Sequence, residues 1–368
     1  MVSYIMKYIF GYEYEYEYEY EYDSYYFENY KKVLEFIPEN KELICKQNFD
    51  RNNELILAIQ NFCGITECKK FIVSLSGGVD SMVLITILKF LGYDVIGVHI
   101  NSNNRKETLD EQNFLEQWCR NNNIKLYIKE VTEINRANVK RADYECAAKK
   151  IRFDFYTEVL IREEVSYIML AHHKDDIVEN IFANLCLGRY ILDLAVIREI
   201  STIKDVIIVR PMLDFYKETI YEFAEKYQVP YFKDTTPKWC VRGRYRNEIY
   251  PLLEDVFTNN VKENLIVLSN QSDQWNELIT KKIVEPYFTT INFMSKKCVF
   301  NVEEYKEYPL CFWNVIFMKI FNNYGKSCPS RKAILVFINS IKIKNVCFIS
   351  LGKCSRCRNK NYEITIEF

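Results

Sequence analysis

Phe71-Ile72-Val73-Ser74-Leu75-Ser76-Gly77-Gly78-Val79-Asp80-Ser81 is the stretch of the sequence that decides the fold class. Residues 71–75 predict a buried parallel strand, and the apolar residues after Ser81 recur at helical spacing. Between them lies a short loop with two adjacent glycines, whose backbone can approach a ligand closely. Because the loop opens a helix, amide donors and the helix dipole favour an anion there. The stretch therefore predicts a polyphosphate site between a strand and a helix of an α/β fold.

Each polar residue of this loop has an expected role. A carboxylate beside bound phosphates repels them unless a cation lies between, so Asp80 is predicted to be a Mg²⁺ ligand. The loop lacks the Lys-Ser/Thr ending of a Walker A loop. An ordinary strand-to-helix turn with coincidental glycines is the alternative interpretation. The predicted phosphate-binding residues are Ser76, Gly77, Gly78, Val79, Asp80 and Ser81.

Composition is typical of a globular protein with room for one sizeable domain and a smaller one. The 368 residues are 49% hydrophobic and 27% charged. The 13 cysteines are scattered, which favours reduced thiols and a cytoplasmic location, and Met1–Phe10 is too short to span a membrane. The pairs Cys63 with Cys68 and Cys354 with Cys357 leave a structural zinc site open, although only three histidines are present.

The charge is distributed unevenly along the chain. Residues 1–50 carry 5 basic and 11 acidic residues, so the other 318 carry 44 basic and 39 acidic ones. Tyr12 to Tyr22 alternates Tyr with Glu, and we expect residues 1–23 to be a disordered acidic tail. The mildly basic remainder is compatible with RNA binding.

Hydrophobic periodicity predicts a helical extension over residues 24–69 and alternating strands and helices over residues 70–215. Such alternation favours a parallel sheet with helices on both faces. A helical region, 216–263, and a small α+β domain, 264–368, are expected to follow. The predicted elements are helices 25–36 and 54–62, strand 71–75, helix 82–91, strand 95–100, helix 109–122, strand 125–131, helix 143–161, strand 167–171, helix 178–187, strand 206–209, helix 217–227, a long helix from about Asn264, a hairpin around Ser295, helices near Trp313 and Ala333, and a closing hairpin of 346–351 with 362–366.

A second candidate site is the segment Ala171–Asn180, which follows a predicted strand and opens a helix. His172, Asp176 and Glu179 are spaced so that their side chains can share a helix face. Asp80 and Asp176 together could hold Mg²⁺, whereas His172 suits hydrogen bonding or proton transfer. His99 also falls at the carboxyl end of a predicted strand, where ligands of parallel sheets bind. The alternative is that the aspartates only complement the helix dipole.

Two further segments carry basic residues. Lys149 and Arg152 lie on one face of a predicted helix with Glu145, which suits a substrate site or a solvated stripe equally well. Downstream, a run of cations alternates with aromatic residues, a pattern that favours phosphate contacts and base stacking over a merely solvated turn. That run contains Trp239, Arg242, Arg244, Tyr245, Arg246 and Asn247.

With these motifs together, the chain resembles the tRNA(Ile)-lysidine synthetase family of PP-loop ATP pyrophosphatases over residues 71–256. The loop alone marks the superfamily, and its combination with His-His-x-Asp-Asp-x-x-Glu and the later Asp-then-Arg-Asn element is more specific. The resemblance implies ATP-dependent adenylation of the wobble cytidine of a tRNA(Ile) with a CAU anticodon. Free L-lysine then displaces AMP to give lysidine.

The resemblance also implies roles for individual residues. Asp80, His172, Asp176, Glu179 and Arg152 would be catalytic, and Asp80 and Asp176 would bind Mg²⁺. ATP would contact the glycine loop and His99. The implied tRNA contacts are Lys149, Arg242, Arg244, Arg246 and Asn247.

The chain departs from the family pattern in places that bear on substrate identity. Asn101–Arg105 replaces the usual Asp-His-Gly-Leu-Arg, and Lys149 replaces an arginine, which forfeits bidentate contacts. A tRNA-thiolating PP-loop enzyme is one alternative, but no Cys-x-x-Cys occurs between Cys68 and Cys240. A tRNA-binding homologue without catalysis is another, and the retained carboxylates oppose it because they repel RNA phosphates.

Overall fold

The computed structural model describes residues 44, 48–66, 68–103, 107–134, 139–189, 191–192, 194–232, 241–257, 260–342, 347–352 and 355–368. The predicted acidic tail, 1–23, and the predicted helix 25–36 lie outside these residues. The described residues form two compact units. The first is drawn from Met1–Glu179 and Ile197–Asn259, and the second from Asn180–Val196 and Asn260–Phe368. No helix in the described ranges is both long and apolar enough to cross a membrane.

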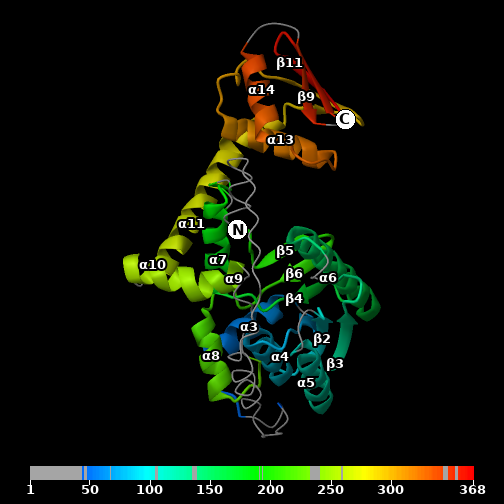
Figure 1. The fold of residues 1–368 in the computed structure, drawn as a ribbon, viewed down its shortest axis with the longest axis vertical. Coiled ribbons are helices and arrows are strands. Elements are labelled where there is room, and N and C mark those ends of the chain that lie inside the picture. Colours follow the sequence, from blue (N-terminus) through cyan, green and yellow to red (C-terminus); the bar gives the residue numbers. More distant parts are fainter. Residues whose placement is uncertain are drawn as a thin grey trace. The chain divides into compact units, whose positions relative to one another are not determined.

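The first unit is built on a six-stranded sheet with the strand order β3-β2-β1-β4-β6-β5 (Figure 1). Five strands are parallel, and β5 pairs antiparallel with β6 at the edge. Its elements are α3 (Glu54–Thr66), β1 (Lys70–Ser74), α4 (Val79–Phe90), β2 (Asp94–Asn101), α5 (Glu107–Asn121), β3 (Lys125–Glu130), α6 (Arg141–Glu163), β4 (Tyr167–Met169), the first half of α7 (Lys174–Cys186), β5 (Ile200–Ile203), β6 (Val206–Val209) and α8 (Lys217–Lys226).

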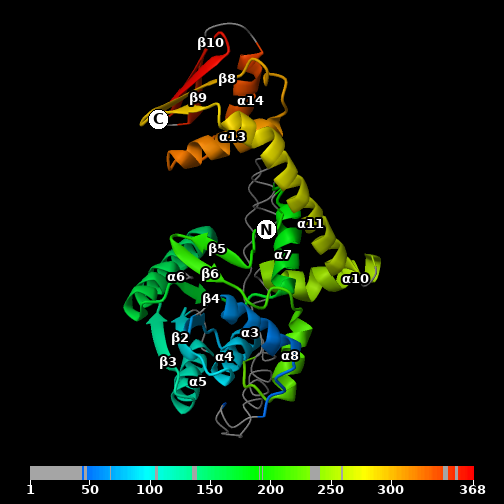
Figure 2. The same cartoon turned by 180° about the vertical axis from the view of Figure 1, so that it is seen from behind.

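Helices cover both faces of this sheet, as the apolar runs of its strands require. Phe71 and Val73 of β1 pack into a core shared with α3, α4 and α8. Ile72, between them, faces the opposite way and packs with Phe153 and Tyr156 of α6. Figure 2 labels the helices α3, α4, α6 and α8 that flank the sheet. The expected fold class is confirmed, with one correction. The half-exposed strand β5 reads Ile-Ser-Thr-Ile and was not predicted, because it buries too little to show a clear hydrophobic pattern.

The strand order explains where a ligand can bind. From β1 the chain proceeds to β2 and β3 on one side, and then returns to place β4 on the other side of β1. Such a switch point leaves a crevice at the carboxyl ends of the two central strands. The glycine loop follows β1, and His172 and His173 follow β4. The two predicted motifs therefore meet at the crevice.

After α8 the first unit ends in one continuous helix whose middle turn is wider than an α-helix. It consists of α9 (Val241–Arg244), a π-helical turn (Tyr245–Ile249) and α10 (Tyr250–Phe257). π-Helical turns inside α-helices are frequently found at functional sites. This one carries Arg246.

The second unit contains an antiparallel sheet of order β7-β8-β11-β10-β9, with two helices on one face. Trp313, Phe317 and Phe337 fill the core between helices and sheet. Its elements are α11 (Val261–Ile279), a π-helical turn (Thr280–Val284), α12 (Glu285–Phe288), β7 (Asn292–Phe293), β8 (Lys297–Asn301), α13 (Leu310–Asn323), α14 (Arg331–Ile341), β9 (Cys347–Gly352), β10 (Ser355–Lys360) and β11 (Glu363–Glu367).

The predicted closing hairpin is wrong in its pairing. Strand β10 lies between β9 and β11, so the two predicted strands do not pair with each other. The sequence of β10, Ser-Arg-Cys-Arg-Asn-Lys, hides its strand character because its inward positions hold Ser355, Cys357 and Asn359. Asn359 is fully buried and satisfied, since it donates to Ser340 and accepts from Tyr362.

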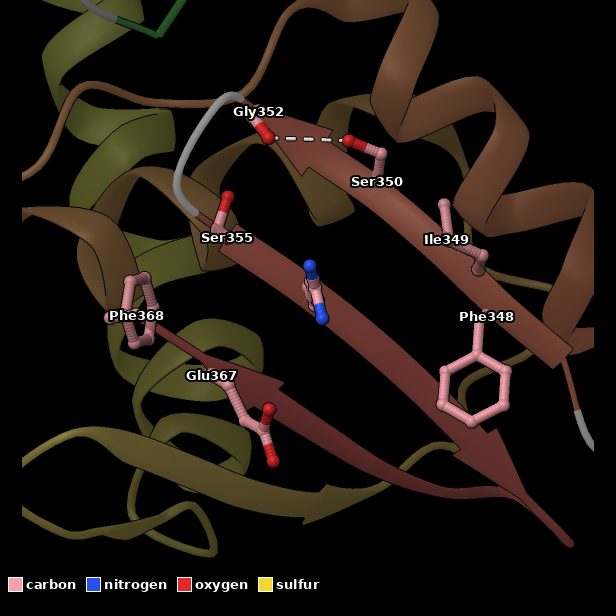
Figure 3. A pocket seen from close by; sticks show the side chains of 8 residues that line it. Phe348, Ile349, Ser350, Gly352, Ser355, Glu367 and Phe368 are labelled. Atoms are coloured by element: carbon pink, nitrogen blue, oxygen red, sulfur yellow. Dashed lines mark hydrogen bonds between the residues drawn. The ribbon is translucent and has the colours of Figure 1, made fainter.

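The other face of this sheet is exposed and basic along one strand. Arg356, Arg358 and Lys360 alternate outward on β10. The exposed Phe348 of β9 lies 5.6 Å from the guanidinium of Arg358. A hollow of about 680 Å³ lies over β9, β10 and the end of β11, between Phe348 and Phe368 (Figure 3).

Candidate active site

The glycine loop is held by hydrogen bonds of its own serines. The amide of Ser76 donates to Oγ of Ser81 at 3.2 Å, and Oγ of Ser81 donates to the carbonyl of Gly78 at 3.0 Å. The two hydroxyls lie 3.1 Å apart. Helix α4 begins at Val79, whose side chain is buried, so only its backbone is available to a phosphate. The loop is thus preformed at a helix N-terminus with the geometry expected of an anion cradle.

Gly77 is required by both backbone and space. Its φ of +85° lies in the left-handed region, and a Cβ there would lie 3.3 Å from the ring of Phe232. Phe232 donates its amide to the carbonyl of Gly77 at 2.9 Å and forms a parallel bridge with Gly78. The segment after α8 therefore fixes one side of the loop.

The second motif joins the loop through His173, whereas we had singled out His172. His173 is 1% exposed, and its Nε2 lies 3.8 Å from Oδ1 of Asp80 and 3.6 Å from Oδ2 of Asp176. Asp176 also accepts a bond from the amide of His173 at 3.1 Å, which closes the N-terminus of α7. The imidazole of His173 thus lies between the two carboxylates predicted to bind Mg²⁺.

His172 has a different neighbour. Its Nδ1 accepts a hydrogen bond of 2.9 Å from Nε of Arg210. Arg210 is 4% exposed and also donates to the carbonyl of Arg198 and to Ser201. Burial lowers the pKa of Arg210, and the charge of Asp176 opposes that shift. Because Nδ1 of His172 is an acceptor, a neutral ring carries its proton on Nε2.

Arg246 reaches this cluster from the π-helical turn. Its Nη2 lies 3.4 Å from Oδ1 of Asp176, and its Nε donates to Oε1 of Glu179. Both carboxylates are nearly buried, with side chains 7% and 8% exposed. We had grouped Arg246 with tRNA-binding residues, and the structure positions it among the predicted catalytic carboxylates.

Lys217 was not predicted by the sequence analysis. It is the first residue of α8, and its Nζ donates to Oδ2 of Asp80 at 3.3 Å. Its own amide donates to Oδ2 of Asp175 at 2.8 Å. Asp175 thereby caps α8 from the neighbouring motif. A basic residue shortly after Arg210-Pro211 is the signal that could have found Lys217.

A pocket of about 410 Å³ lies at the carboxyl ends of β1 and β4. Among its lining residues are Ser76, Gly78, Val79, Asp80, Ser81, Arg152, His172, Asp176, Lys217, Phe232 and Arg246. Arg152 of α6 therefore lines the pocket, a position that its spacing in the sequence left open and that the resemblance implied. Nearby Tyr156 anchors α6 to the end of β1, since its hydroxyl lies 2.7 Å from Oγ of Ser74.

The remaining predicted residues lie elsewhere. His99 is buried beneath the loop, where its Nδ1 lies 2.8 Å from the carbonyl of Leu75. Burial lowers the pKa of His99, although the Leu75 bond opposes this. Lys149 is exposed on α6, with its Nζ 5.9 Å from the ring of Phe153. Arg244 pairs with exposed Glu248 at 2.9 Å, and Asn247 donates to the carbonyl of Gly243. The side chain of Arg242 lies outside the described residues.

The donor chemistry at Asp80 and Asp176 fits Mg²⁺. Oδ1 of Asp80 is buried and accepts no hydrogen bond within the described part of the chain. Mg²⁺ in nucleotide sites is usually bound by one or two carboxylates together with substrate phosphates. Among the described residues, no group of three or more His, Cys, Asp or Glu side chains is arranged to hold a metal ion. Cys354 of the possible zinc pair lies outside them, and Cys63 is a buried thiol whose pKa burial raises to about 12.

The fold and the loop define a PP-loop protein, and the chain belongs to the PP-loop domain family, whose model matches residues 51–253. Within that family it is similar to tRNA(Ile)-lysidine synthases. It is 27% identical to the tRNA(Ile)-lysidine synthase of Chlamydia pneumoniae, over 83% of this chain and 92% of that protein.

Two more distant similarities extend the comparison. The chain is 31% identical to the bifunctional protein TilS/HprT of Listeria monocytogenes, over 50% of this chain and 30% of that protein. The solved structure of the U34-tRNA thiolase NcsA from Methanococcus maripaludis covers 61% of this chain and 79% of its own. It matches with 19% identity and a TM-score of 0.48.

Proposed function

We propose that this protein is a tRNA(Ile)-lysidine synthetase. In this proposal ATP adenylates the wobble cytidine of a CAU-anticodon tRNA(Ile), and the ε-amine of free lysine then displaces AMP. The observation that carries it is the contact of Arg246 with Asp176 and Glu179, because Arg246 and Asp176 line the pocket of the glycine loop. That contact unites the two motifs that the resemblance treats as most specific. The likeness to the Chlamydia pneumoniae enzyme over most of both chains supports the same reaction.

For the adenylation step, the loop would bind the phosphates through its amides and the hydroxyls of Ser76 and Ser81. The oxygen O2 of cytidine attacks the α-phosphorus, and pyrophosphate leaves with the electron pair of the broken bond. Arg152 lines the same pocket and can neutralise the phosphate under attack. Mg²⁺ held by Asp80 and Asp176 would make pyrophosphate a better leaving group.

For the lysine step, the carboxylates of Asp176 and Glu179 would attract the ammonium group of the amino acid. Arg246 already bridges these two carboxylates, so the ammonium group of lysine would share them with Arg246 rather than replace it. The amine must lose a proton before it attacks C2 of cytidine. Nδ1 of His172 already accepts a hydrogen bond from Arg210, so this nitrogen cannot also accept the proton of the amine. We therefore assign proton acceptance to Glu179 and assign His172 to orienting the substrate.

For the tRNA itself, the outer face of the second unit's sheet offers a complementary surface. Arg356, Arg358 and Lys360 recur every second residue of β10, and Phe348 offers a ring for stacking. Replacing all three cations with alanine should weaken tRNA binding and lower the slope of log affinity against log salt by about 3. ATP binding should be unchanged in that variant. An unaltered salt slope would assign tRNA binding to other surfaces.

The direct test is incubation with Mg-ATP, radiolabelled lysine and an unmodified CAU-anticodon tRNA(Ile) transcript. Label on the RNA together with AMP is the expected result. A transcript with a different anticodon is the matched control and should remain unlabelled. AMP formation that depends on tRNA but leaves no label would contradict lysidine synthesis and direct the search to sulfur as the acceptor. No AMP with any tRNA would contradict catalysis altogether.

A further inference from the structure

We propose that Lys217 is a pyrophosphate-binding residue of this pocket. Its ammonium group would leave Asp80 and bind the β- and γ-phosphates of ATP. It would remain bound to pyrophosphate when pyrophosphate leaves the α-phosphorus. The role in catalysis rests on the proposed function. The binding part requires only that the PP-loop pocket takes ATP.

The position of Lys217 relative to the loop is the first argument. Its Nζ lies 3.3 Å from Oδ2 of Asp80, in the first turn of the helix that the loop opens. Both side chains line the pocket with Ser76 and Gly78. They are 20% and 23% exposed, so the pair is neither sealed in the core nor free in solvent. A phosphate that enters the loop must therefore approach this ion pair.

The attachment of Lys217 is the second argument. Its amide is bound by Asp175 at 2.8 Å, and the amide of Lys174 donates to the carbonyl of Phe215 at 2.8 Å. These two bonds tie the start of α8 to the start of α7. The backbone of Lys217 is thus fixed, whereas its four-carbon side chain can move its charge between partners.

A comparison with the other cations of the site shows why Lys217 is suited to changing its partner from Asp80 to a phosphate. Arg246 contacts two nearly buried carboxylates, and Arg210 is buried with three hydrogen-bond acceptors. Moving either would leave buried charges or polar atoms without partners, which is costly. Lys217 forms its ion pair with Asp80, the carboxylate predicted to bind Mg²⁺. When Mg²⁺ occupies Asp80, the ammonium loses little by turning to the phosphates.

The movement of charge during adenylation explains what Lys217 would contribute to the reaction. As the bond between the α-phosphorus and the bridging oxygen breaks, its electron pair and negative charge pass to pyrophosphate. An ammonium group that has turned toward that oxygen lowers the energy of the developing charge without transferring a proton. Lys217 would therefore act on the leaving group, while Arg152 would act on the phosphate that stays with the base.

The test measures binding of pyrophosphate, ATP and AMP by calorimetry in Mg²⁺ buffer, without RNA. Lys217→Met should weaken pyrophosphate and ATP binding by about 10- to 100-fold, the range for loss of a charged hydrogen bond. AMP lacks the β- and γ-phosphates, so its affinity should change less than about threefold. Lys226→Met is the matched control, because Lys226 is exposed at the other end of α8. It should bind all three ligands as the unaltered protein does.

Lys217→Arg retains the charge and should recover most of the lost pyrophosphate affinity. Unchanged pyrophosphate binding in Lys217→Met would overturn the proposal. Equal losses for AMP and pyrophosphate would also overturn it, because they would show that Lys217 only organises the pocket. These outcomes are separate from the function test. Failure of lysine transfer with normal pyrophosphate selectivity would contradict lysidine synthesis and leave the role of Lys217 standing.

Discussion

Two charged clusters lie at opposite ends of the strands of the same sheet and are built on opposite plans. At the amino ends, Glu163 is surrounded by donors from Lys125, Tyr127 and Lys70. At the carboxyl ends, Asp80, Asp176 and Glu179 share a pocket with cations, and Oδ1 of Asp80 accepts no hydrogen bond in the described residues. The first cluster satisfies its carboxylate fully. The second keeps binding capacity for a ligand.

This difference separates stabilisation from function. A carboxylate with several donors favours the folded state, as its lowered pKa indicates. A group of carboxylates held close together costs stability and is retained where chemistry needs it. Substitutions in the two clusters should therefore have opposite consequences for activity and for unfolding.

The largest effect should come from Asp80→Asn. We expect AMP formation to fall about 100- to 1,000-fold, because the charge that we propose holds Mg²⁺ at the leaving group is lost. The free energy of unfolding and the tRNA affinity should change little. AMP release and urea unfolding are the measurements, and Asp94→Asn, an exposed carboxylate at the start of β2, is the control. Parallel loss of stability would mean that Asp80 is structural like Glu163.

A smaller effect is expected for Arg246→Lys. Lysine keeps the charge but cannot contact Asp176 and Glu179 with two nitrogens, so AMP formation should fall about tenfold. Arg244→Lys is the matched control two residues away, because Arg244 pairs with exposed Glu248. Steady-state rates of both variants would measure this. Equal effects at the two positions would argue that charge near the helix matters and pocket geometry does not.

Gly77→Ala should weaken ATP binding about tenfold, or about 1.4 kcal/mol. The new methyl group would lie 3.3 Å from the ring of Phe232 and push the loop out of place. Gly92→Ala is the matched control, because its backbone has a similar φ of +86° and an added Cβ would have no atom within 4 Å. Both variants should lose about 1 kcal/mol of stability, and ATP affinity should fall only for the first. ATP titration and thermal unfolding distinguish them.

The smallest effect should be Glu163→Gln, with a loss of about 1 kcal/mol of stability at pH 7 and unchanged AMP formation. Hydrogen bonds from Lys125 and then Tyr127 lower the pKa of Glu163 from 4.5 to about 2. The stabilisation is therefore complete above pH 4.5 and is lost as the pH falls toward 2. Urea unfolding of both proteins at pH 7 and pH 3 should show the difference shrinking. Glu158→Gln, an exposed change on α6, should show no such pH dependence.

The sequence predicted the parts of the fold that carry strong periodicity. The apolar runs of β1, β2, β4 and β6 and the amphipathic helices between them were found within a few residues of their bounds. Strands β5 and β10 were missed, because a partly exposed edge strand and a strand with Ser, Cys and Asn inside lack an alternating apolar pattern. Local pattern carries no information about such tertiary burial.

The sequence predicted the motifs of the site but not which of their side chains contact one another. Asp80, Arg152, His172 and Asp176 all line the pocket. Which of two adjacent histidines is buried between carboxylates depends on the turn after β4, so His173 was overlooked. Lys217 and the partners of Arg246 depend on how residues more than 60 positions apart converge. Spacing within one helix cannot reveal such contacts.

The π-helical turn at Tyr245–Ile249 makes the site sensitive to the deletion of a single residue. Such a turn amounts to an α-helix with one added residue, and each residue of a helix advances it by about 100°. Deleting one residue within the turn would restore a regular helix and rotate Arg246 relative to α10. The direction in which Arg246 points thus depends on the number of residues in this turn. A lineage could lose it through the removal of a single codon while every side chain of the motif stayed the same.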